Sequence, residues 1–250
     1  MGELKAPPLT ENYSLVGTAF DYLLRFYIER LNEVQSGKKW LAEEVVEMVS
    51  EAPRFHRECE SLLKTAKRAH SRFMKSGKIG DSLLLGACYL AHLDMIYRTG
   101  YSVNLDVCDQ NDLKDLGRLI SLVEPSLFKA DWACLLNPTF GKASRLVGGA
   151  DADLVIDDAL IEVKTIKELK FDTTTFYQLA GYYILYQIGG FEGYPKGRSI
   201  ERLGVYYSRY GLLKRFPAKC VFGSPGYDRF VEWFVHRAKE EMSHGTTVKE

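Results

Sequence analysis

The chain has 250 residues, with 33 lysine and arginine residues against 33 aspartate and glutamate residues, so its formal net charge is zero. A zero net charge argues against a histone-like or wholly basic protein. It does not exclude a local basic groove, because steering depends on where the charges lie. The hydrophobic content of 46% is ordinary for a soluble globular protein. The length permits one large domain or a domain with a small helical attachment.

The sequence predicts neither a membrane protein nor a disulfide-rich one. No apolar run reaches about 18 residues, and residues 1–14 lack the apolar core of a signal peptide. We therefore expect a cytoplasmic protein without a membrane partner. The five cysteines are odd in number and widely spaced, without a CxxC pair, which favours free thiols over disulfides or a zinc ribbon.

The first half of the chain is predicted to be helical. Apolar residues recur at helical spacing after a polar, proline-containing start. Asp81 can cap one helix and Asp112 another, and Pro125 ends the helical pattern. The expected helices cover residues 14–32, 39–49, 54–74, 81–99 and 112–124.

The second half changes to a pattern of strands and helices. Residues 144–165 are strand-like, and a helix that Asp172 or a following threonine can cap runs to Gly189. A strand is expected in 201–210, a partner strand after Gly211, and a closing amphipathic helix in 226–242. This β-β-α-β-β-α order predicts an α/β protein, with a helical region in residues 1–125 packed on a core in residues 126–250.

The stretch GGADADLVIDDALIEVKT contains an unusual set of acids within a predicted hairpin. If Asp157 and Asp158 form a two-residue turn, Asp153 lies directly opposite Glu162. Because side chains alternate along a strand, Asp153, Glu162 and Lys164 then emerge on one face, and the other face is apolar.

Two carboxylates at such a position repel each other, because directly opposed β-carbons lie about 4.5–5.5 Å apart. A divalent cation between them would relieve the repulsion, and oxygen ligands favour Mg²⁺ or Mn²⁺ over zinc. The alternative is a surface hairpin with solvated acids. The apolar opposite face and the helix that follows, which we expect to cover the acids, weigh against that alternative.

The helix TTTFYQLAGYYILYQI is apolar almost all round, with Gln178 as the conspicuous polar residue. Tyr182 lies four residues further on, hence on the same helical face. The two side chains could orient a carboxylate, the lysine or a nucleotide. The alternative is a core helix whose glutamine bonds to the backbone.

Asp153, the Glu162-Val163-Lys164 strand and the Gln178-Leu-Ala-Gly-Tyr182 segment together resemble the PD-(D/E)XK nuclease superfamily, and most closely its RecB-type branch with a QxxxY motif. The resemblance covers about residues 146–186, and more loosely the strand at 203–210. It implies a restriction-endonuclease-like mixed β-sheet flanked by helices and Mg²⁺- or Mn²⁺-dependent cleavage of phosphodiester bonds, usually in DNA.

The same resemblance implies roles for individual residues. Asp153, Glu162 and the backbone carbonyl of Val163 would hold the metal, Lys164 would position or activate water, and Gln178 and Tyr182 would shape the site. An upstream helix would supply a further acid, for which Glu124 is the candidate and Asp131 the alternative. The sequence departs from the pattern at Ala152, where proline is usual.

Two cofactors are not expected. The clustered cysteines of the iron–sulfur members are missing, so we expect no cluster. The GxxxxGK[ST] loop is also missing, so we expect no bound nucleotide, and ATP-driven movement would need a helicase or another DNA-processing partner.

A basic stripe on the third expected helix is the candidate surface for nucleic acid. Arg57, Lys64, Arg68 and Lys75 fall near one helical face and could neutralise phosphates without reading sequence. The alternative is the solvated outer face of a surface helix.

The sequence thus favours a metal-dependent deoxyribonuclease acting in repair, recombination or defence. One alternative is an inactive nucleic-acid-binding protein of the same fold. Another is a glycoside hydrolase that uses Asp153 and Glu162 as paired carboxylates, in which Lys164 would have no obvious role. Strand polarity, cleavage at ends or within strands, DNA versus RNA, and oligomeric state stay open.

Overall fold

The computed structural model describes residues 2–34, 39–99, 108–223 and 225–245. The chain forms two compact units. The first comprises Met1–Lys129, Lys164–Leu169 and Tyr207–Leu212, and the second comprises Ala130–Val163, Lys170–Tyr206 and Leu213–Glu250. The sequence analysis expected a single boundary between residues 125 and 126. In the structure, Lys164–Leu169 and Tyr207–Leu212 of the second half group with the helical unit.

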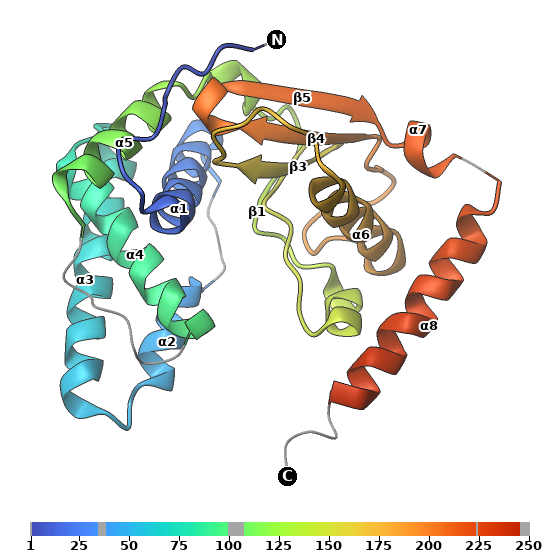
Figure 1. Ribbon diagram of the computed structural model, residues 1–250, viewed down its shortest axis with the longest axis horizontal. Helices are drawn as coiled ribbons and strands as arrows, with labels where there is room; N and C mark the ends of the chain where they lie inside the picture. Colours follow the sequence, from blue (N-terminus) through green and yellow to red (C-terminus); the bar gives the residue numbers. More distant parts are fainter. Residues whose placement is uncertain (1, 35–38, 100–107, 224, 246–250) are drawn as a thin grey trace. The chain divides into compact units, whose positions relative to one another are not determined.

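The described residues of the first unit form five α-helices, as the apolar spacing predicts (Figure 1). They are α1 (Tyr13–Asn32), α2 (Leu41–Met48), α3 (Pro53–Ser76), α4 (Asp81–Thr99) and α5 (Gln110–Ser121), followed by the short 3-10 helix η1 (Pro125–Leu127). Helix α4 is buried on almost all sides, whereas α3 buries one face. Gly86 lets these two helices approach closely, since a β-carbon there would lie 3.2 Å from the α-carbon of Ala66.

The start of α5 differs from the prediction. Asp109, not Asp112, is the N-cap, and its carboxylate accepts hydrogen bonds from the backbone N–H groups of Asn111 and Asp112. Asp112 returns the interaction by accepting from the N–H of Asp109. The two acids therefore form a reciprocal capping box, in which the acid three residues into the helix resembles a cap in sequence.

The second unit carries most of a five-stranded sheet, which confirms the predicted α/β class. The strands are β1 (Cys134–Leu136), β2 (Leu154–Ile156), β3 (Ala159–Lys164), β4 (Arg202–Tyr207) and β5 (Leu212–Pro217), in the order β1-β2-β3-β4-β5. Strands β1, β2 and β3 pair antiparallel. The arrows of β3 and β4 point the same way and β5 points back, so the sheet is mixed (Figure 1).

The predicted hairpin register is confirmed between β2 and β3. Leu154 pairs with Ile161, and Ile156 pairs with Ala159 across a two-residue turn. Asp157 adopts a left-handed conformation in this turn, with φ of 53°. Its carboxylate accepts hydrogen bonds from the N–H groups of residues 131–133, which fixes the turn against the chain that leads into β1.

Three local predictions were wrong. The start of the expected strand is the 3-10 helix η2 (Gly141–Val147), because Ser144 bonds to the backbone at both ends of this turn, at Phe140 and Ala150. Strand β1 was not predicted at all. The end of the last expected strand is helix α7 (Lys219–Phe222), since Pro217 has no N–H to continue the ladder.

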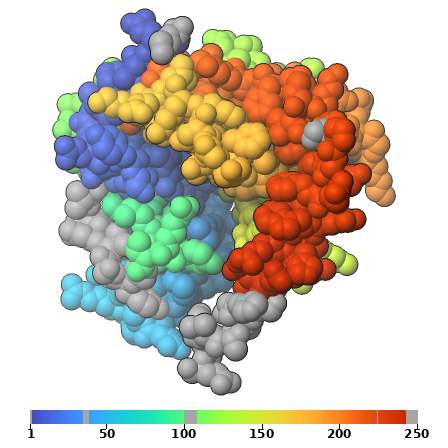
Figure 2. Space-filling view, turned by 45° about the vertical axis from the view of Figure 1, so that its right-hand side comes forward, coloured from blue at the N-terminus to red at the C-terminus, as the bar shows by residue number. Residues whose placement is uncertain are grey.

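Two longer helices complete the second unit. Helix α6 (Thr173–Gly189) connects β3 to β4, and the Asp172 carboxylate caps it by accepting from the N–H of Thr175, as predicted. Helix α8 (Tyr227–Gly245) lies at the surface, drawn in red in Figure 2, and exposes Phe230 and Trp233. Within the described part of the chain, no helix is long and apolar enough to cross a membrane.

Candidate functional site

The acids of the hairpin lie just beyond the ladder between β2 and β3. Asp153 precedes β2, and its Oδ2 accepts a hydrogen bond of 2.7 Å from the backbone N–H of Val163. The observed register, continued by one residue, puts Asp153 opposite Glu162. Glu162 is 3% exposed. The hairpin therefore brings one buried and one half-buried carboxylate together, as the two-residue turn predicts.

The backbone around Asp153 is also held from its other side. The carbonyl of Asp153 accepts from the N–H of Asn137, and the carbonyl of Pro138 accepts from the N–H of Ala152. A bridge between Thr139 and Asp151 extends this pairing. Strand β1 and its extension thus fix the position of the acid, a contribution that the sequence analysis missed because β1 is only three residues long.

Val163 offers a backbone oxygen in the same region. In an antiparallel pair, the N–H and C=O of one residue point to the same neighbouring strand. Because the N–H of Val163 points to Asp153, its carbonyl is directed to that side of β3 as well. The role of this carbonyl as a metal ligand stays a prediction.

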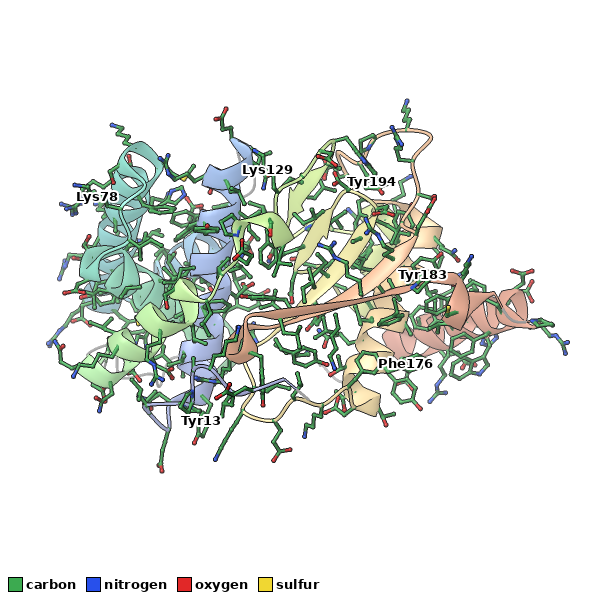
Figure 3. The ribbon with its side chains drawn as sticks, turned by 90° about the horizontal axis from the view of Figure 1, so that it is seen from above. Tyr13, Lys78, Lys129, Phe176, Tyr183 and Tyr194 are labelled. Carbon is green, nitrogen blue, oxygen red and sulfur yellow. The ribbon has the colours of Figure 1, made fainter. Side chains whose placement is uncertain are left out.

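Helix α6 brings Gln178 and Tyr182 to the acids. Nε2 of Gln178 donates a hydrogen bond of 3.0 Å to the hydroxyl of Tyr182. Gln178 therefore has a side-chain partner on its own helix, and the alternative of a core helix stays open. The ring of Tyr182 packs against Phe140, with ring centroids 5.4 Å apart. Figure 3 labels two other aromatic residues of this helix, Phe176 and Tyr183.

The Tyr182 hydroxyl is buried and is subject to the negative charge of the hairpin acids. Burial raises the pKa of the Tyr182 hydroxyl, and the charges of Glu162, Asp153 and Asp151 raise it further. The hydrogen bond from Gln178 acts in the opposite direction. Tyr182 is therefore protonated at neutral pH and can donate its proton to an acceptor, while its oxygen accepts from Gln178.

Asp151 is a further acid to which the sequence analysis assigned no role. It is exposed, it lies two residues before Asp153, and its charge acts on Tyr182. The sequence GADAD, in which Asp151 and Asp153 lie two residues apart, was the pattern that could have identified Asp151. A two-residue spacing on an extended chain places both side chains on the same side.

Lys164 is the last residue of β3 and is half-buried. By the alternation of side chains along the strand, it lies on the same face as Glu162. Its backbone carbonyl accepts from the hydroxyl of Ser208, which also donates to the hydroxyl of Thr165. The chain directly after the strand is thereby anchored.

Of the two further candidate acids, Asp131 lies at the turn end of the hairpin. The N–H of Asp131 donates to Asp157 at the hairpin turn, and about four extended residues, roughly 13 Å, separate that turn from Asp153. Glu124 belongs to the first unit, where it accepts from the hydroxyl of Ser126. Burial raises the pKa of Tyr27, and the charge of Glu124 raises it further. Asp131 is therefore not a neighbour of Asp153, and the role of Glu124 stays a prediction.

No group of three or more histidine, cysteine, aspartate or glutamate side chains suited to a metal occurs among the described residues. Mg²⁺ does not need such a group, because it keeps several waters and binds proteins through one or two carboxylates. Asp153, Glu162 and the Val163 carbonyl would be oxygen ligands of this kind. The negative charge that raises the pKa of Tyr182 would be offset by a bound cation. The donor set therefore fits Mg²⁺ or Mn²⁺.

The four basic residues of the predicted stripe are all exposed on α3. Their spacing puts Arg57, Lys64, Arg68 and Lys75 along one side of the helix, while residues such as Leu63 and Ala66 form the buried side. Lys64 pairs with Glu60 at 2.9 Å, which lowers its net contribution to the positive charge. The arrangement is compatible with a phosphate-binding surface and with a solvated outer face.

No protein-family model, curated protein or solved structure matches this chain.

Proposed function

We propose that this protein is a metal-dependent nuclease with a restriction-endonuclease-like core, and that it hydrolyses phosphodiester bonds in DNA. The observation that carries the proposal is the group of carboxylates around Tyr182. Asp153, Glu162 and Asp151 all act electrostatically on one hydroxyl of α6. Burying a carboxylate such as Glu162 is costly unless a cation or hydrogen bonds compensate it. A cation bound between these carboxylates would offset their mutual repulsion.

Each residue has a role that follows from its position. Asp153, Glu162 and the Val163 carbonyl would hold Mg²⁺ or Mn²⁺, which would supply charge stabilisation to the phosphate. Lys164, on the face of β3 that carries Glu162, would position the attacking water and stabilise charge on the phosphate oxygens. Tyr182, oriented by Gln178, would donate a hydrogen bond to a carboxylate and fix its geometry.

The substrate would be held chiefly through its phosphates. The exposed stripe on α3 provides a row of positive charges that would contact phosphates, so affinity would depend on salt and little on sequence. DNA is the class that the resemblance favours, and RNA is an outcome to be tested with the same reaction. A helicase or another DNA-processing protein would be a partner for any ATP-driven movement.

The test is cleavage of linear, circular and single-stranded DNA, and of RNA, by the purified protein with Mg²⁺ or Mn²⁺. We expect cleavage that a chelator abolishes, and that Glu162→Gln and Lys164→Ala each lower by at least about 100-fold. Glu201→Gln is the matched control. Glu201 is an exposed acid whose N–H bonds to Asp158 at the hairpin turn, so it lies at the opposite end of β3.

Three results would count against this function. Cleavage at full rate by both site variants would assign the activity to another site or to a contaminant. DNA binding without cleavage under every condition would favour an inactive nucleic-acid-binding protein. Equal loss of activity in Glu201→Gln would indicate that the site variants act through the fold.

A further inference from the structure

Four aromatic side chains gather at the start of α6, within the second unit. Phe171 lies two residues before the helix begins, and its ring packs edge-on against the rings of Phe176 and Phe216, with centroids 6.4 and 5.7 Å apart. Tyr177 extends the group beyond Phe176, with ring centroids 5.9 Å apart. Figure 3 labels Phe176 on this helix. We call these four residues the aromatic surface.

The aromatic surface is largely open to solvent. Tyr177 is 67% exposed and Phe171 is 47% exposed. The buried side of α6 consists of other residues, such as Leu179 and Ile184. Single exposed aromatic residues are common on soluble proteins, whereas contiguous exposed groups mark binding sites. Packing of the core therefore does not account for these rings.

The rings are held in place before any ligand binds. One of them belongs to β5, and two belong to the first turns of α6. The Asp172 carboxylate fixes the chain between Phe171 and the helix, because its Oδ1 accepts from both the N–H and the hydroxyl of Thr175. A platform held on a strand and a helix loses little conformational entropy when a ligand stacks on it.

Two lysines flank the rings. Lys170 directly precedes Phe171, and its side chain is 54% exposed. Lys214 is exposed and lies two residues before Phe216 on β5, so alternation puts both side chains on one face of the strand. The acid Asp172 also lies here, but its Oδ1 serves the helix cap and its Oδ2 lies 3.8 Å from the Nζ of Lys170. The aromatic surface thus combines exposed rings with positive charge.

This combination selects one class of ligand. A protein partner buries an interface core from which lysine is depleted. Proteins that hold single strands of nucleic acid stack the bases on aromatic rings and bind the phosphates with positive charges. In a duplex the base faces are already stacked on each other, so only unpaired nucleotides offer them to a ring. The chemistry of the aromatic surface therefore fits an unpaired strand.

We propose that the aromatic surface stacks the bases of single-stranded DNA and presents the unpaired strand to the proposed nuclease site. Phe176 and Tyr177 directly precede Gln178, which bonds to the hydroxyl of Tyr182. A strand stacked on the rings therefore lies next to the part of α6 that the proposed site uses. The choice of DNA rests on the proposed function, whereas stacking itself needs neither a metal ion nor cleavage.

The test is binding of dye-labelled oligothymidylate, and of a duplex of the same length, to the full chain. Fluorescence anisotropy measures both affinities, with EDTA present so that nothing is cleaved. We expect the double variant Phe171→Ala with Tyr177→Ala to bind the single strand at least about 10-fold more weakly and the duplex unchanged. Because both residues are exposed, the thermal unfolding midpoint should stay that of the natural protein. Phe171→Trp with Tyr177→Trp keeps the ring faces and should keep the affinity for the single strand.

The matched control removes another exposed pair of rings from the same unit. Phe230 and Trp233 of α8 stack with centroids 5.5 Å apart and are 46% and 58% exposed. Phe230→Ala with Trp233→Ala should leave the affinities for single strand and duplex unchanged.

The lysines give an independent readout. Each phosphate contact contributes about 0.7 to the slope of log K against log salt for a single strand. Replacing Lys170 and Lys214 by glutamine should therefore lower that slope by about 1.4. An unchanged slope would overturn the assignment of phosphates to these lysines.

Failure of this inference and failure of the nuclease function give different results. Single-strand binding that is unchanged in Phe171→Ala with Tyr177→Ala would overturn the stacking surface, even if the protein cleaves DNA. Binding that is lost in that variant, in a protein that cleaves nothing, would support the surface and overturn the nuclease. Equal weakening for single strand and duplex, or equal losses in the α8 control, would show that the rings do not stack bases. Tighter binding of oligouridylate than of oligothymidylate would overturn DNA as the ligand.

Discussion

The backbone N–H of Val163 donates a 2.7 Å hydrogen bond to Oδ2 of Asp153, which ties the carboxylate to the residue next to Glu162. This bond separates two roles of Asp153. In Asp153→Asn the amide oxygen can still accept from Val163, but the charge is lost. We expect cleavage to fall at least about 100-fold while the thermal unfolding midpoint changes little.

Asp153→Ala is the comparison. It removes the acceptor as well as the charge, so we expect an additional loss of stability of about 1–3 kcal/mol. Cleavage rates with Mg²⁺ measure the loss of activity in each variant, and denaturant unfolding measures the loss of stability. Full activity in Asp153→Asn would exclude the carboxylate charge from the reaction.

The hydrogen bond between Gln178 and Tyr182 predicts non-additive variants. If Gln178 acts by orienting the hydroxyl of Tyr182, it has nothing to orient in Tyr182→Phe. We expect Gln178→Ala and Tyr182→Phe each to lower the cleavage rate about 10-fold, and the double variant to lose little more than either one. The measurement is the single-turnover cleavage rate of the natural protein, of each single variant and of the double variant, which together form a double-mutant cycle. Losses that multiply would show that the two side chains act independently.

The stripe on α3 predicts a change in salt dependence. Each phosphate contact that a lysine or arginine makes contributes about 0.9 to the slope of log K against log salt for duplex DNA. Replacing Arg57, Lys64, Arg68 and Lys75 by glutamine should lower that slope by about 3, with Lys64 contributing least because it pairs with Glu60. Filter binding of duplex DNA at several salt concentrations measures this slope.

A control with the same change of charge uses exposed basic residues of the second unit. Replacing Lys219, Arg229, Arg237 and Lys239 by glutamine should leave the slope unchanged. Equal slopes for both quadruple variants would show that α3 is a solvated outer face.

The local order of the chain could be predicted, because helix periods and turn residues are properties of neighbouring positions. The two-residue turn at Asp157 and Asp158 determined the register, and the register determined which acid faces Glu162. Strand β1 could not be predicted, since its three residues form a strand only by pairing with β2. Residues 141–147 were misjudged because the hydrogen bonds of Ser144 override their strand-like composition.

The site was predictable in part for the same reason. Asp153, Glu162 and Lys164 follow from strand alternation, and Gln178 and Tyr182 from helix spacing. The position of a distant acid such as Asp131 depends on long-range packing, which no local pattern encodes.

Asp94 predicts a pH dependence of stability. It is buried, its Oδ1 accepts a 2.8 Å hydrogen bond from the hydroxyl of Tyr22, and burial raises its pKa to about 6. In the unfolded chain the pKa of aspartate is about 3.9. Between about pH 4 and pH 6, the folded protein therefore keeps a proton on Asp94 that the unfolded chain has released. The contribution of the protonated Asp94 to stability is full below about pH 4 and is lost as the pH rises to about 6.

Asp94→Asn removes that titration and keeps an acceptor for Tyr22. The free energy of unfolding of the variant minus that of the natural protein should rise by about 3 kcal/mol between pH 4 and pH 7. Urea unfolding at several pH values measures this difference, in which other titrating groups cancel. A difference that is constant with pH would show that Asp94 titrates alike in both states.

The ion pair between Arg209 and Asp115 predicts an asymmetric pair of variants. The two side chains are 1% and 0% exposed, they share two hydrogen bonds of 2.9 and 3.0 Å, and Arg209 also donates to the carbonyl of Ala6. Arg209→Met leaves the Asp115 carboxylate buried without its cation, and we expect it to lose about 3–5 kcal/mol of stability. The double variant Arg209→Met with Asp115→Leu removes both charges, so it should regain much of that loss.

Arg54→Ala, which breaks an exposed pair with Glu58, should have no measurable effect in the same unfolding experiment. A double variant as unstable as Arg209→Met would show that the hydrogen bond to Ala6, and not the buried charge, determines the cost.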